Sequence, residues 1–305
     1  MSPALSLSWN SFRFSRGQEI VDEAKGLGFD RVELNFSLTP QVVEDILALS
    51  GQGKIKVTSL HNFCPFPDGF TREQALPDCY SLAAEDEAER RQAVRWTRQT
   101  IDYCQRFRAR AVVLHAGKVN MADETRTLLK LRFSAEPGRR RQYELLRAKM
   151  QRDRKARAKL HLEQVKKSLE ELSRYAQDRG VALGLENRFY FSEIPNFFEI
   201  EGLLSHFAPA DIFYWHDTGH ARIMEILGFV PSAGDFLRCY GERLLGLHLH
   251  DVRGHKDHLA PFTGELDFDE IKPYAREGVI KIIEAHHPAT SEEVARARER
   301  IESWR

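Results

Sequence analysis

The side chains best suited to chemistry in this chain stand at the ends of short apolar runs. Seven of eight such runs finish with a residue that can bind a metal ion or carry a proton, namely Glu33, His61, His115, Glu186, Asp217, His248 and Glu284. The first run ends with Trp9-Asn10 instead. With 45 Asp and Glu and 12 His among 305 residues, about one residue in five is of these types, so chance would place one or two at eight positions. We infer that the seven residues share a functional site.

The stretch 181–188 shows this arrangement most clearly. It reads Val-Ala-Leu-Gly-Leu-Glu-Asn-Arg and follows Gly180, a residue type that often ends a helix. An apolar run of this length is typical of a strand buried on both faces, and this one delivers a carboxylate, an amide and a guanidinium at its carboxyl end. A loop that begins with a carboxylate explains this single stretch equally well. The repetition of the pattern at the other strand ends favours a polar pocket.

A pocket that holds several carboxylates is unfavourable unless a cation neutralises them, so the pattern predicts a divalent metal. The proposed ligands are Glu186, Asp217, His248 and Glu284. Their mixed oxygen and nitrogen donors suit Mn²⁺, Co²⁺, Zn²⁺ or Mg²⁺ and argue against copper or an iron–sulfur cluster.

Further histidines gather near these positions in the sequence. They occur in the segments His216-Asp217-Thr218-Gly219-His220, His248-Leu249-His250-Asp251, His255-Lys256-Asp257-His258 and His286-His287. A lone histidine is more often a satisfied core residue, and these histidines cannot all be metal ligands.

Sequence spacing predicts different positions for several of these histidines. His220 lies three residues after Asp217 and is placed to orient a substrate or to support a metal ligand. Alternation along a strand puts His250 on the same face as His248, and it puts His216 on the face opposite to Asp217. We expect the remaining histidines to be structural or surface residues: His161, His206, His286 and His287.

The elements that must position these residues alternate strictly between strand and helix. The expected strands are 4–9, 32–34, 56–61, 111–115, 181–186, 212–217, 245–250 and 279–284. The expected helices include 17–27, 40–49 capped by Thr39, 85–107, 196–207, 221–244 with a break near Pro231, 268–276 and 291–304. Eight such units predict parallel strands closed into an α/β fold of the (β/α)₈ TIM barrel type, with residues 1–305 forming a single domain.

A doubly wound open sheet is the structural alternative. Such a sheet is expected to carry a Gly-rich phosphate-binding turn after its first strand. The corresponding segment here is Ser11-Phe12-Arg13-Phe14-Ser15, which contains no glycine. The barrel is therefore the favoured fold, and its active site would lie at the carboxyl ends of the strands.

A long basic helical insertion, residues 118–167, interrupts the alternation after the fourth strand. It holds 16 Lys and Arg residues against six Asp and Glu, a local charge of +10, and residues 138–177 predict one long helix. We expect the insertion to project from the carboxyl-end face with its basic side chains exposed. A solvated arm, a contact between subunits of a homo-oligomer and an anion-attracting lid all fit this composition.

The overall composition argues against a membrane protein and against a general nucleic-acid binder. Lys and Arg number 45 and Asp and Glu number 45, so the whole chain has no charge preference for a polyanion. The four cysteines (Cys64, Cys79, Cys104 and Cys239) lack CxxC spacing, as expected of reduced thiols. No signal peptide and no membrane-spanning apolar run is visible, so we expect a soluble, cytoplasmic protein.

Five motifs, in their order along the chain, resemble the xylose isomerase-like TIM barrels. They are Leu-Glu-Asn-Arg (185–188), Asp-Thr-Gly-His (217–220), His-Leu-His-Asp (248–251), Asp-His-Leu-Ala-Pro followed by Gly-Glu-Leu-Asp-Phe (257–268), and Ile-Ile-Glu (282–284). The superfamily includes sugar and sugar phosphate isomerases and epimerases, inosose dehydratases and the endonuclease IV repair enzymes. The resemblance spans the whole chain apart from the insertion.

The ketose 3-epimerase branch of this superfamily implies a metal-dependent isomerase or epimerase that acts on a small sugar, sugar phosphate or polyol. By this resemblance Glu186, Asp217, His248 and Glu284 hold one divalent metal, and Glu186 and Glu284 double as the catalytic acid and base. Two carboxylates around a metal-bound carbonyl can remove and return a proton at the adjacent carbon. The expected substrate-binding residues are His220, His61, His115, Arg188, Arg253, Asp251, Asp257 and Trp9, with Phe66, Phe189 and Tyr190 as further walls.

An endonuclease-like phosphodiester hydrolase is the alternative activity, and a lyase of the same superfamily is also open. Eight residues occupy positions that resemble the three-zinc site of that branch: His61, His115, Glu186, Asp217, His220, His248, Asp257 and Glu284. That branch separates its late Asp and His by one residue, whereas Asp257 and His258 are adjacent here. The insertion would suit DNA phosphates, but the rest of the chain must be net acidic. A sugar-binding regulator without catalysis is a third reading, against which the intact pair of Glu186 and Glu284 argues.

Overall fold

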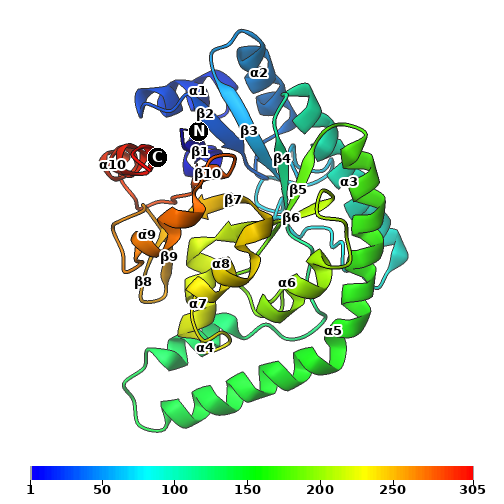
Figure 1. Ribbon diagram of the computed structural model, residues 1–305, viewed down its shortest axis with the longest axis vertical. Coiled ribbons are helices and arrows are strands. Elements are labelled where there is room, and N and C mark those ends of the chain that lie inside the picture. The colour runs from blue at the N-terminus through cyan, green and yellow to red at the C-terminus, as the bar shows by residue number, and fades with distance from the viewer. Residues whose placement is uncertain (1, 305) are drawn as a thin grey trace.

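Eight parallel strands close into a barrel surrounded by helices (Figure 1). The computed structural model describes residues 2–304. The barrel order is β1-β10-β7-β6-β5-β4-β3-β2. The strands are β1 Ala4–Ser6, β2 Arg31–Leu34, β3 Lys56–His61, β4 Ala111–Leu114, β5 Ala182–Glu186, β6 Ile212–Asp217, β7 Leu244–Leu249 and β10 Ile280–Ile283. The predicted (β/α)₈ barrel is confirmed.

The helices fall close to their expected positions. They are α1 Gly17–Gly26, α2 Pro40–Gly51, α3 Glu87–Arg106, α4 Thr125–Arg132, α5 Arg139–Gln177, α6 Phe197–Leu204, α7 Thr218–Ile226, α8 Gly234–Tyr240, α9 Phe268–Ile271 and α10 Ser291–Glu302. Thr39 caps α2 as predicted, since its hydroxyl accepts from the Val42 N–H at 3.2 Å. Asn196 and Glu199 form a reciprocal capping box at α6.

The fold differs from the sequence-based expectation most clearly in three places. The first strand ends at Ser6, because Leu7–Trp9 turn into a 3₁₀ helix. The helix expected over 221–244 begins directly after β6, where Asp217 caps it, and it is divided into α7 and α8 on either side of Pro231. A short antiparallel hairpin, β8 Asp251–Arg253 with β9 Lys256–Leu259, follows β7 and was not expected.

A tryptophan fills the interior of the barrel. Trp215 on β6 is fully buried among residues such as Ala111, Val113 and Ile282. The neighbouring strands make room for its ring with glycines: a Cβ built on Gly184 would lie 2.9 Å from the Trp215 ring, and one on Gly246 would lie 2.4 Å from it. The interior below the strand ends is therefore a packed apolar core, as in other barrels of this type.

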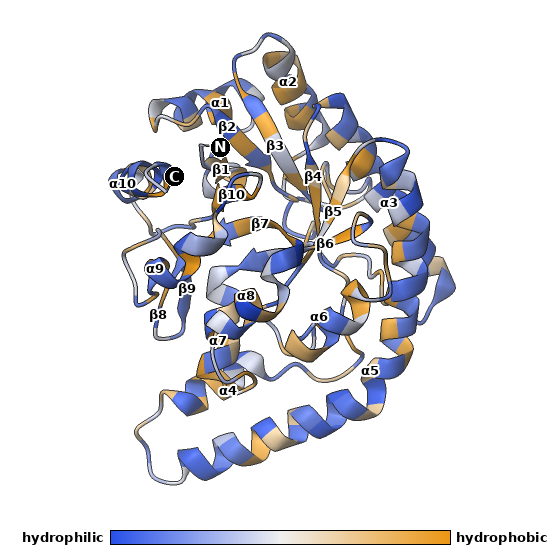
Figure 2. Cartoon of the chain, in the orientation of Figure 1, coloured by the Kyte–Doolittle hydropathy of each residue, from blue (hydrophilic) through white to orange (hydrophobic). Residues whose placement is uncertain are grey.

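The basic insertion consists of α4 and the first part of α5, which confirms the predicted helical insertion. Helix α5 runs along the lower and right-hand edge of the molecule and is largely hydrophilic with scattered apolar residues (Figures 1 and 2). From Met150 onwards a single stripe, spaced three or four residues apart, is buried: Met150, Arg154, Ala158, His161, Val165, Leu169, Leu172 and Ala176. This stripe packs α5 against the barrel and α3.

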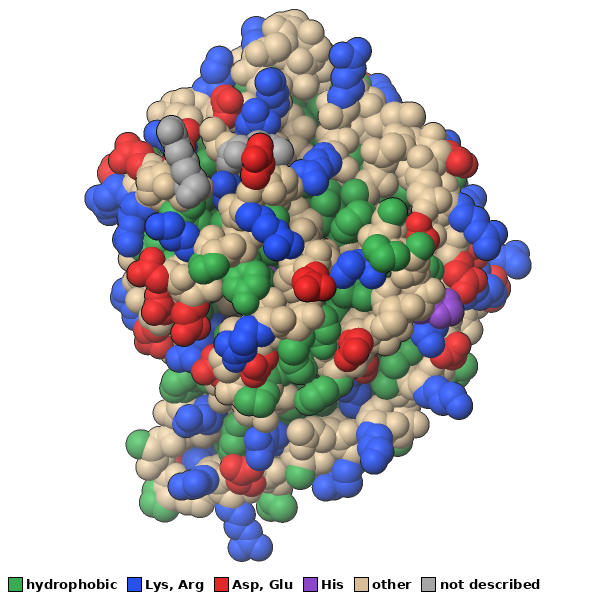
Figure 3. Space-filling view, in the orientation of Figure 1, with side chains coloured by type: hydrophobic (Ala, Val, Ile, Leu, Met, Phe, Trp, Pro, Cys, Tyr) green, Lys and Arg blue, Asp and Glu red, His purple; other side chains and the backbone are tan. Residues whose placement is uncertain are grey.

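The expectation that all basic residues of the insertion are exposed is wrong at Arg154. Its guanidinium is buried and donates to both carboxylate oxygens of Glu199, at 2.9 and 2.6 Å, and to the Glu193 carbonyl at 2.9 Å. Arg154 thereby ties α5 to the connection between β5 and α6. Elsewhere on the visible face Lys and Arg are interspersed with Asp and Glu (Figure 3). Within residues 2–304, none of the helices combines the length and the apolar character needed to cross a membrane.

Candidate metal centre

Four strand-end side chains meet at the carboxyl end of the barrel. They are Glu186, Asp217, His248 and Glu284, hereafter the quartet, and one potential ligand atom from each lies within 4.8 Å of every other. Three of the residues belong to β5, β6 and β7, and the fourth directly follows β10. All four are buried. Parallel strands deliver their carboxyl ends to one mouth of a barrel, which explains the convergence.

His248 lies at the centre of the quartet. Its Nδ1 is 2.8 Å from Glu186 Oε1 and 3.0 Å from Glu284 Oε2, and its Nε2 is 2.8 Å from Glu33 Oε1. Burial disfavours the charged ring, but the carboxylates of Glu284 and Glu33 outweigh it, so the pKa of His248 lies well above its usual value. His248 Nδ1 therefore faces the carboxylates among which a cation would be held.

Glu33 supports the quartet from outside. Its second oxygen, Oε2, accepts from the Ser59 hydroxyl at 2.7 Å, and the carboxylate is fully buried. A carboxylate on the far nitrogen of a histidine fixes the ring orientation and raises its basicity towards a metal. Glu33 was among the seven strand-end candidates, but this supporting position beside His248 emerged only from the folded chain.

Asp217 is oriented by groups that leave little freedom to its carboxylate. Its Oδ1 accepts from the backbone N–H of His220 at 2.7 Å, and both oxygens lie within 3.0 Å of His250 Nε2. The His258 N–H donates to His250 Nδ1 at 2.9 Å, so the proton of that ring is on Nε2 and is donated to Asp217. Burial opposes ionisation, but His220 and His250 lower the pKa of Asp217 strongly.

Asn187 braces β5 against β6 beside the quartet. Its side-chain oxygen accepts from the Asp217 N–H at 2.8 Å, and its amide donates to the Asp217 carbonyl at 2.9 Å. The same oxygen accepts from the Tyr214 hydroxyl at 2.9 Å, and Tyr214 contacts His216 Nδ1 at 2.7 Å. His216 thus faces Tyr214 and Phe236 rather than the quartet, as strand alternation predicts, and burial lowers its pKa to about 3.

A second group adjoins the quartet through Glu186. It consists of His61, His115 and Glu186, hereafter the two-histidine cluster. His115 Nε2 is 2.7 Å and His61 Nε2 is 3.8 Å from Glu186 Oε2. Arg188 also reaches this oxygen and His115 Nε2 with its Nη1. Burial alone would raise the pKa of Glu186, but Arg188 and His115 hold it well below its usual value.

A third group, hereafter the outer histidine cluster, adjoins the quartet through Asp217. It contains Asp217, His220, His250 and His258. His258 stacks between His250 and His286 with ring centroids 4.0 Å apart on each side. Burial disfavours its charge, but the hydrogen bond that His258 Nδ1 donates to Asp257 Oδ2 at 2.9 Å raises the pKa of His258 to about 9. His286, which we expected to be a structural or surface residue, lies within this stack.

His220 presents one free nitrogen to the site. Its Nδ1 lies 3.1 Å from the Asn187 carbonyl, which can only accept, so Nδ1 carries the proton and Nε2 keeps its lone pair. Burial lowers the pKa of His220 to about 4, against the opposing effect of Asp217. A neutral imidazole of this kind can bind a substrate hydroxyl or a metal ion.

The remaining substrate-binding candidates do not join these groups. Asp251 is fully buried and accepts three backbone N–H groups, those of Val252, Gly264 and Leu266, at 2.8 to 3.0 Å, so it fixes the loop after β7. Arg253 is exposed on β8 and donates to the Thr263 carbonyl. Trp9 is buried beneath Arg13, with 5.1 Å between the guanidinium and the ring.

The other histidines divide as expected between surface and structure. His206 and His287 are exposed. His161 is buried on α5, where Nδ1 donates to the Ala83 carbonyl at 2.8 Å and Nε2 accepts from the Asn120 N–H at 3.0 Å. Strand alternation placed His250 on the same face as His248, but sequence spacing gave no signal for the contacts of Asn187 and His250 with Asp217, because each contact depends on a partner from another strand.

The donor set of the quartet fits a divalent cation. Three buried carboxylates and one imidazole nitrogen provide oxygen and nitrogen ligands in one place, and ionised carboxylates at this density require positive charge. Glu186 and Asp217 would not have to lose a proton before binding a cation, since both have depressed pKa values.

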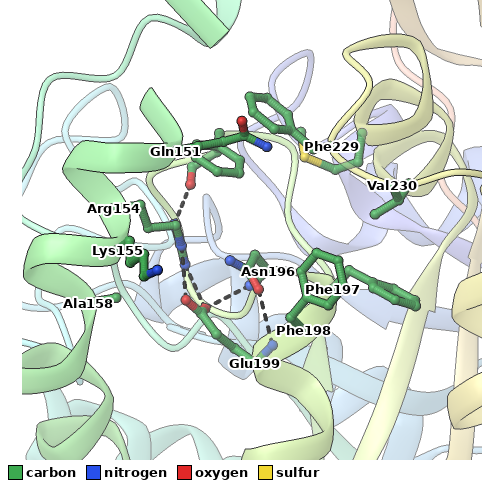
Figure 4. Close-up of a pocket in the computed structure, with 12 residues that line it drawn as sticks. Gln151, Arg154, Lys155, Ala158, Asn196, Phe197, Phe198, Glu199, Phe229 and Val230 are labelled. Atoms are coloured by element: carbon green, nitrogen blue, oxygen red, sulfur yellow. Dashed lines mark hydrogen bonds and ion pairs between the residues drawn. The ribbon is translucent and has the colours of Figure 1, made fainter. Parts of the chain in front are cut away.

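A separate cavity lies between α5 and the region of α6 and α7 (Figure 4). Its walls are mostly apolar and include Phe197, Phe198, Phe229 and Val230. The guanidinium of Arg154 at its edge is engaged by Glu199. None of the ionisable residues of the quartet or of the two adjoining clusters lines this cavity, so the chemistry is centred elsewhere.

Solved structures with the same fold come from more than one kind of enzyme. The 3-keto-D-glucoside 4-epimerase YcjR of E. coli has a TM-score of 0.68 and 14% identity, covering 99% of each chain. A D-tagatose 3-epimerase-like protein has a TM-score of 0.64 and 17% identity over 100% of this chain and 97% of the other. A family 2 AP endonuclease from Brucella melitensis has a TM-score of 0.64 and 16% identity over 97% of each chain. At these identities the likeness concerns the fold alone.

Sequence comparison identifies the family. The uncharacterized protein y4fM of Sinorhizobium fredii (strain NBRC 101917 / NGR234) is 29% identical over 107 residues, 34% of this chain. The match spans only 32% of that relative's length. The model of the xylose isomerase-like TIM barrels, in contrast, matches residues 21–305. With the closed barrel and the strand-end motifs already described, this match shows that the chain belongs to the xylose isomerase-like TIM-barrel family.

Proposed function

We propose that the protein is a divalent-metal-dependent epimerase or isomerase of a sugar, sugar phosphate or polyol. The observation that carries the proposal is the quartet, in which three carboxylates and His248 converge within 4.8 Å in a buried site. The similar solved structures include enzymes named for the epimerisation of D-tagatose, L-ribulose and 3-keto-D-glucosides. A small carbohydrate with a carbonyl group is therefore the substrate class to test first.

The chemistry of such a reaction is proton transfer at the carbon next to a carbonyl. A divalent cation held by the quartet would polarise the carbonyl and acidify the adjacent C–H bond. Glu186 and Glu284 reach the centre from β5 and from the end of β10, strands separated by β6 and β7 in the barrel. One carboxylate can remove the proton while the other returns a proton to the opposite face, and the roles exchange in the reverse reaction.

The neighbouring side chains would bind and enclose the substrate. His220 offers its free Nε2 to a substrate hydroxyl, because Nδ1 is occupied by the Asn187 carbonyl. Phe189 is buried beside it, with 6.0 Å between the two ring centroids, and Tyr190 packs on Phe189 at 4.8 Å. Aromatic rings in these positions would limit the access of water to the reacting carbon.

Solvent exchange provides the direct test. Metal-loaded protein is incubated in D₂O with ketopentoses, ketohexoses, their phosphates and 3-keto-glycosides, and the products are analysed by NMR. We expect an epimer or isomer with deuterium at the carbon that loses its proton, and no reaction after removal of the metal. Turnover that is unaffected by chelation would contradict the proposal, and so would turnover of a substrate that has no C–H bond next to a carbonyl.

A phosphodiester hydrolase is the second candidate, and a specific observation favours it. The two-histidine cluster and the outer histidine cluster lie on either side of the quartet and could hold further ions. Two or three metal ions in one site are typical of phosphodiester hydrolysis. Metal-dependent cleavage of DNA with an abasic site, lost on replacement of His61 or His115, would support this activity over the epimerase.

A further inference from the structure

Arg188 is inserted into the two-histidine cluster. Its Nη1 donates both to His115 Nε2 and to Glu186 Oε2, and the side chain is buried. These two acceptors are the ligand atoms that a second metal ion would need, together with His61 Nε2. The guanidinium therefore occupies the position of a cation beside the quartet.

The carboxylate of Glu186 is divided between the two positions. Its Oε1 faces His248 in the quartet at 2.8 Å, whereas its Oε2 faces Arg188, His115 and His61. A carboxylate that bridges two metal ions uses its oxygens in the same way. In this chain one of the two positive charges is part of the polypeptide.

The contacts of Arg188 on its other side hold it in place. Nη2 donates to Glu193 Oε1 at 3.2 Å, and Glu193 Oε2 accepts from the Tyr190 N–H at 2.9 Å. An arginine remains charged at any accessible pH and offers no lone pair to a metal. A divalent ion next to it would find the lone pairs of His115 Nε2 and Glu186 Oε2 already engaged by the guanidinium. It would also face an uncompensated like charge in a buried site.

We propose that Arg188 replaces a second metal ion, so that the chain binds one ion in the quartet and none in the two-histidine cluster. Arg188 is then the residue that keeps an ion out of the two-histidine cluster and selects against phosphodiester chemistry that needs an ion there. The inference rests on the proposed function only in taking the quartet as the site of that single ion.

Counting bound ions tests the inference without any substrate. Metal-free protein is equilibrated with Zn²⁺, freed of excess metal, and the ions per chain are measured by elemental analysis and native mass spectrometry. We expect one ion in the natural protein, one in Arg188→Lys, and two in Arg188→Ala and Arg188→Gln. The double variant Arg188→Ala/His115→Ala should return to one, and Asp217→Ala should lose the quartet ion.

Several outcomes would overturn the inference. They are an unchanged count in both Arg188→Ala and Arg188→Gln, an additional ion that persists without His115, or a natural protein that binds two ions and loses one in His115→Ala. If the arginine variants do not fold, the natural protein and His115→Ala still test the inference, because a lower count in His115→Ala would reveal an ion in the two-histidine cluster and overturn it. The natural protein could bind no ion while Arg188→Ala binds one that depends on His115. This result would support the replacement of a metal ion by Arg188 and would contradict the proposed function.

Discussion

The two layers of the barrel interior differ in what fixes their side chains. The inner layer is apolar and is centred on Trp215, whose ring requires glycine at positions 184 and 246. The mouth holds the quartet, to which the same strand contributes Asp217, two residues after Trp215. Volume specifies the inner layer, whereas paired hydrogen bonds and charges specify the mouth.

Because of this difference, we expect the inner layer to determine stability and the mouth to determine function. An apolar layer tolerates changes of identity when volume is kept, and it responds mainly to cavities and clashes. A charged layer responds to the loss of a single partner, because the remaining buried group is left unpaired. Substitutions at the mouth should therefore change catalysis and metal binding, while substitutions in the inner layer should change the free energy of unfolding.

The largest effect is expected for Glu284→Gln. The change keeps the shape and one oxygen ligand but removes the titratable group, so activity should fall at least ~10²-fold with metal saturating. Turnover and deuterium incorporation on the identified substrate measure it. Glu277→Gln, at an exposed position on the way to β10, is the matched control and should be neutral. Full activity of Glu284→Gln would exclude the two-carboxylate mechanism.

Glu33→Gln should weaken metal binding by about 10- to 100-fold, the usual consequence of losing a carboxylate behind a metal-binding histidine. The carboxylate contacts His248 Nε2 at 2.8 Å and so orients the ring from outside the quartet. Competition with a chelator of known affinity provides the dissociation constant. Glu44→Gln removes a carboxylate that pairs with Arg106 on the surface, and it should leave the affinity unchanged.

Gly246→Ala should lower the free energy of unfolding by about 1–3 kcal/mol, the typical effect of overpacking a core. A Cβ at this position would lie 2.4 Å from the Trp215 ring. Urea denaturation measures the change, and the folded variant should bind metal as before. Gly26→Ala is the control, because nothing lies within 4 Å of its added Cβ. Equal stabilities of Gly246→Ala and Gly26→Ala would show that the inner layer is not specified by volume.

The smallest effect concerns the pH dependence contributed by His258 and Asp257. The folded pKa of His258, about 9, is above the usual 6.5, so its contribution to stability is complete below pH 6.5 and is lost as the pH rises through 9. Asp257→Asn should therefore destabilise metal-free protein more at pH 6 than at pH 10. Denaturation at the two pH values measures the difference, and Asp153→Asn on α5 serves as a surface control. A destabilisation that grows towards pH 10 would contradict the assignment.

Local patterns in the sequence were sufficient for the framework. Alternating apolar runs and amphipathic segments predicted the closed barrel, and Thr39 was recognisable as a helix cap. The strand-end positions of Glu186, Asp217, His248 and Glu284 followed from the same pattern, because all parallel strands present their carboxyl ends at one mouth.

Only the tertiary structure decided which side chain each of these residues meets. Glu33 and His248 are 215 positions apart, and Arg188 could have faced solvent rather than His115. The buried stripe of α5 likewise made Arg154 a core residue within a segment that reads as a charged arm. Periodicity fixes the face on which a side chain lies, but its partner depends on how distant strands and loops pack, and that information is absent from any local stretch.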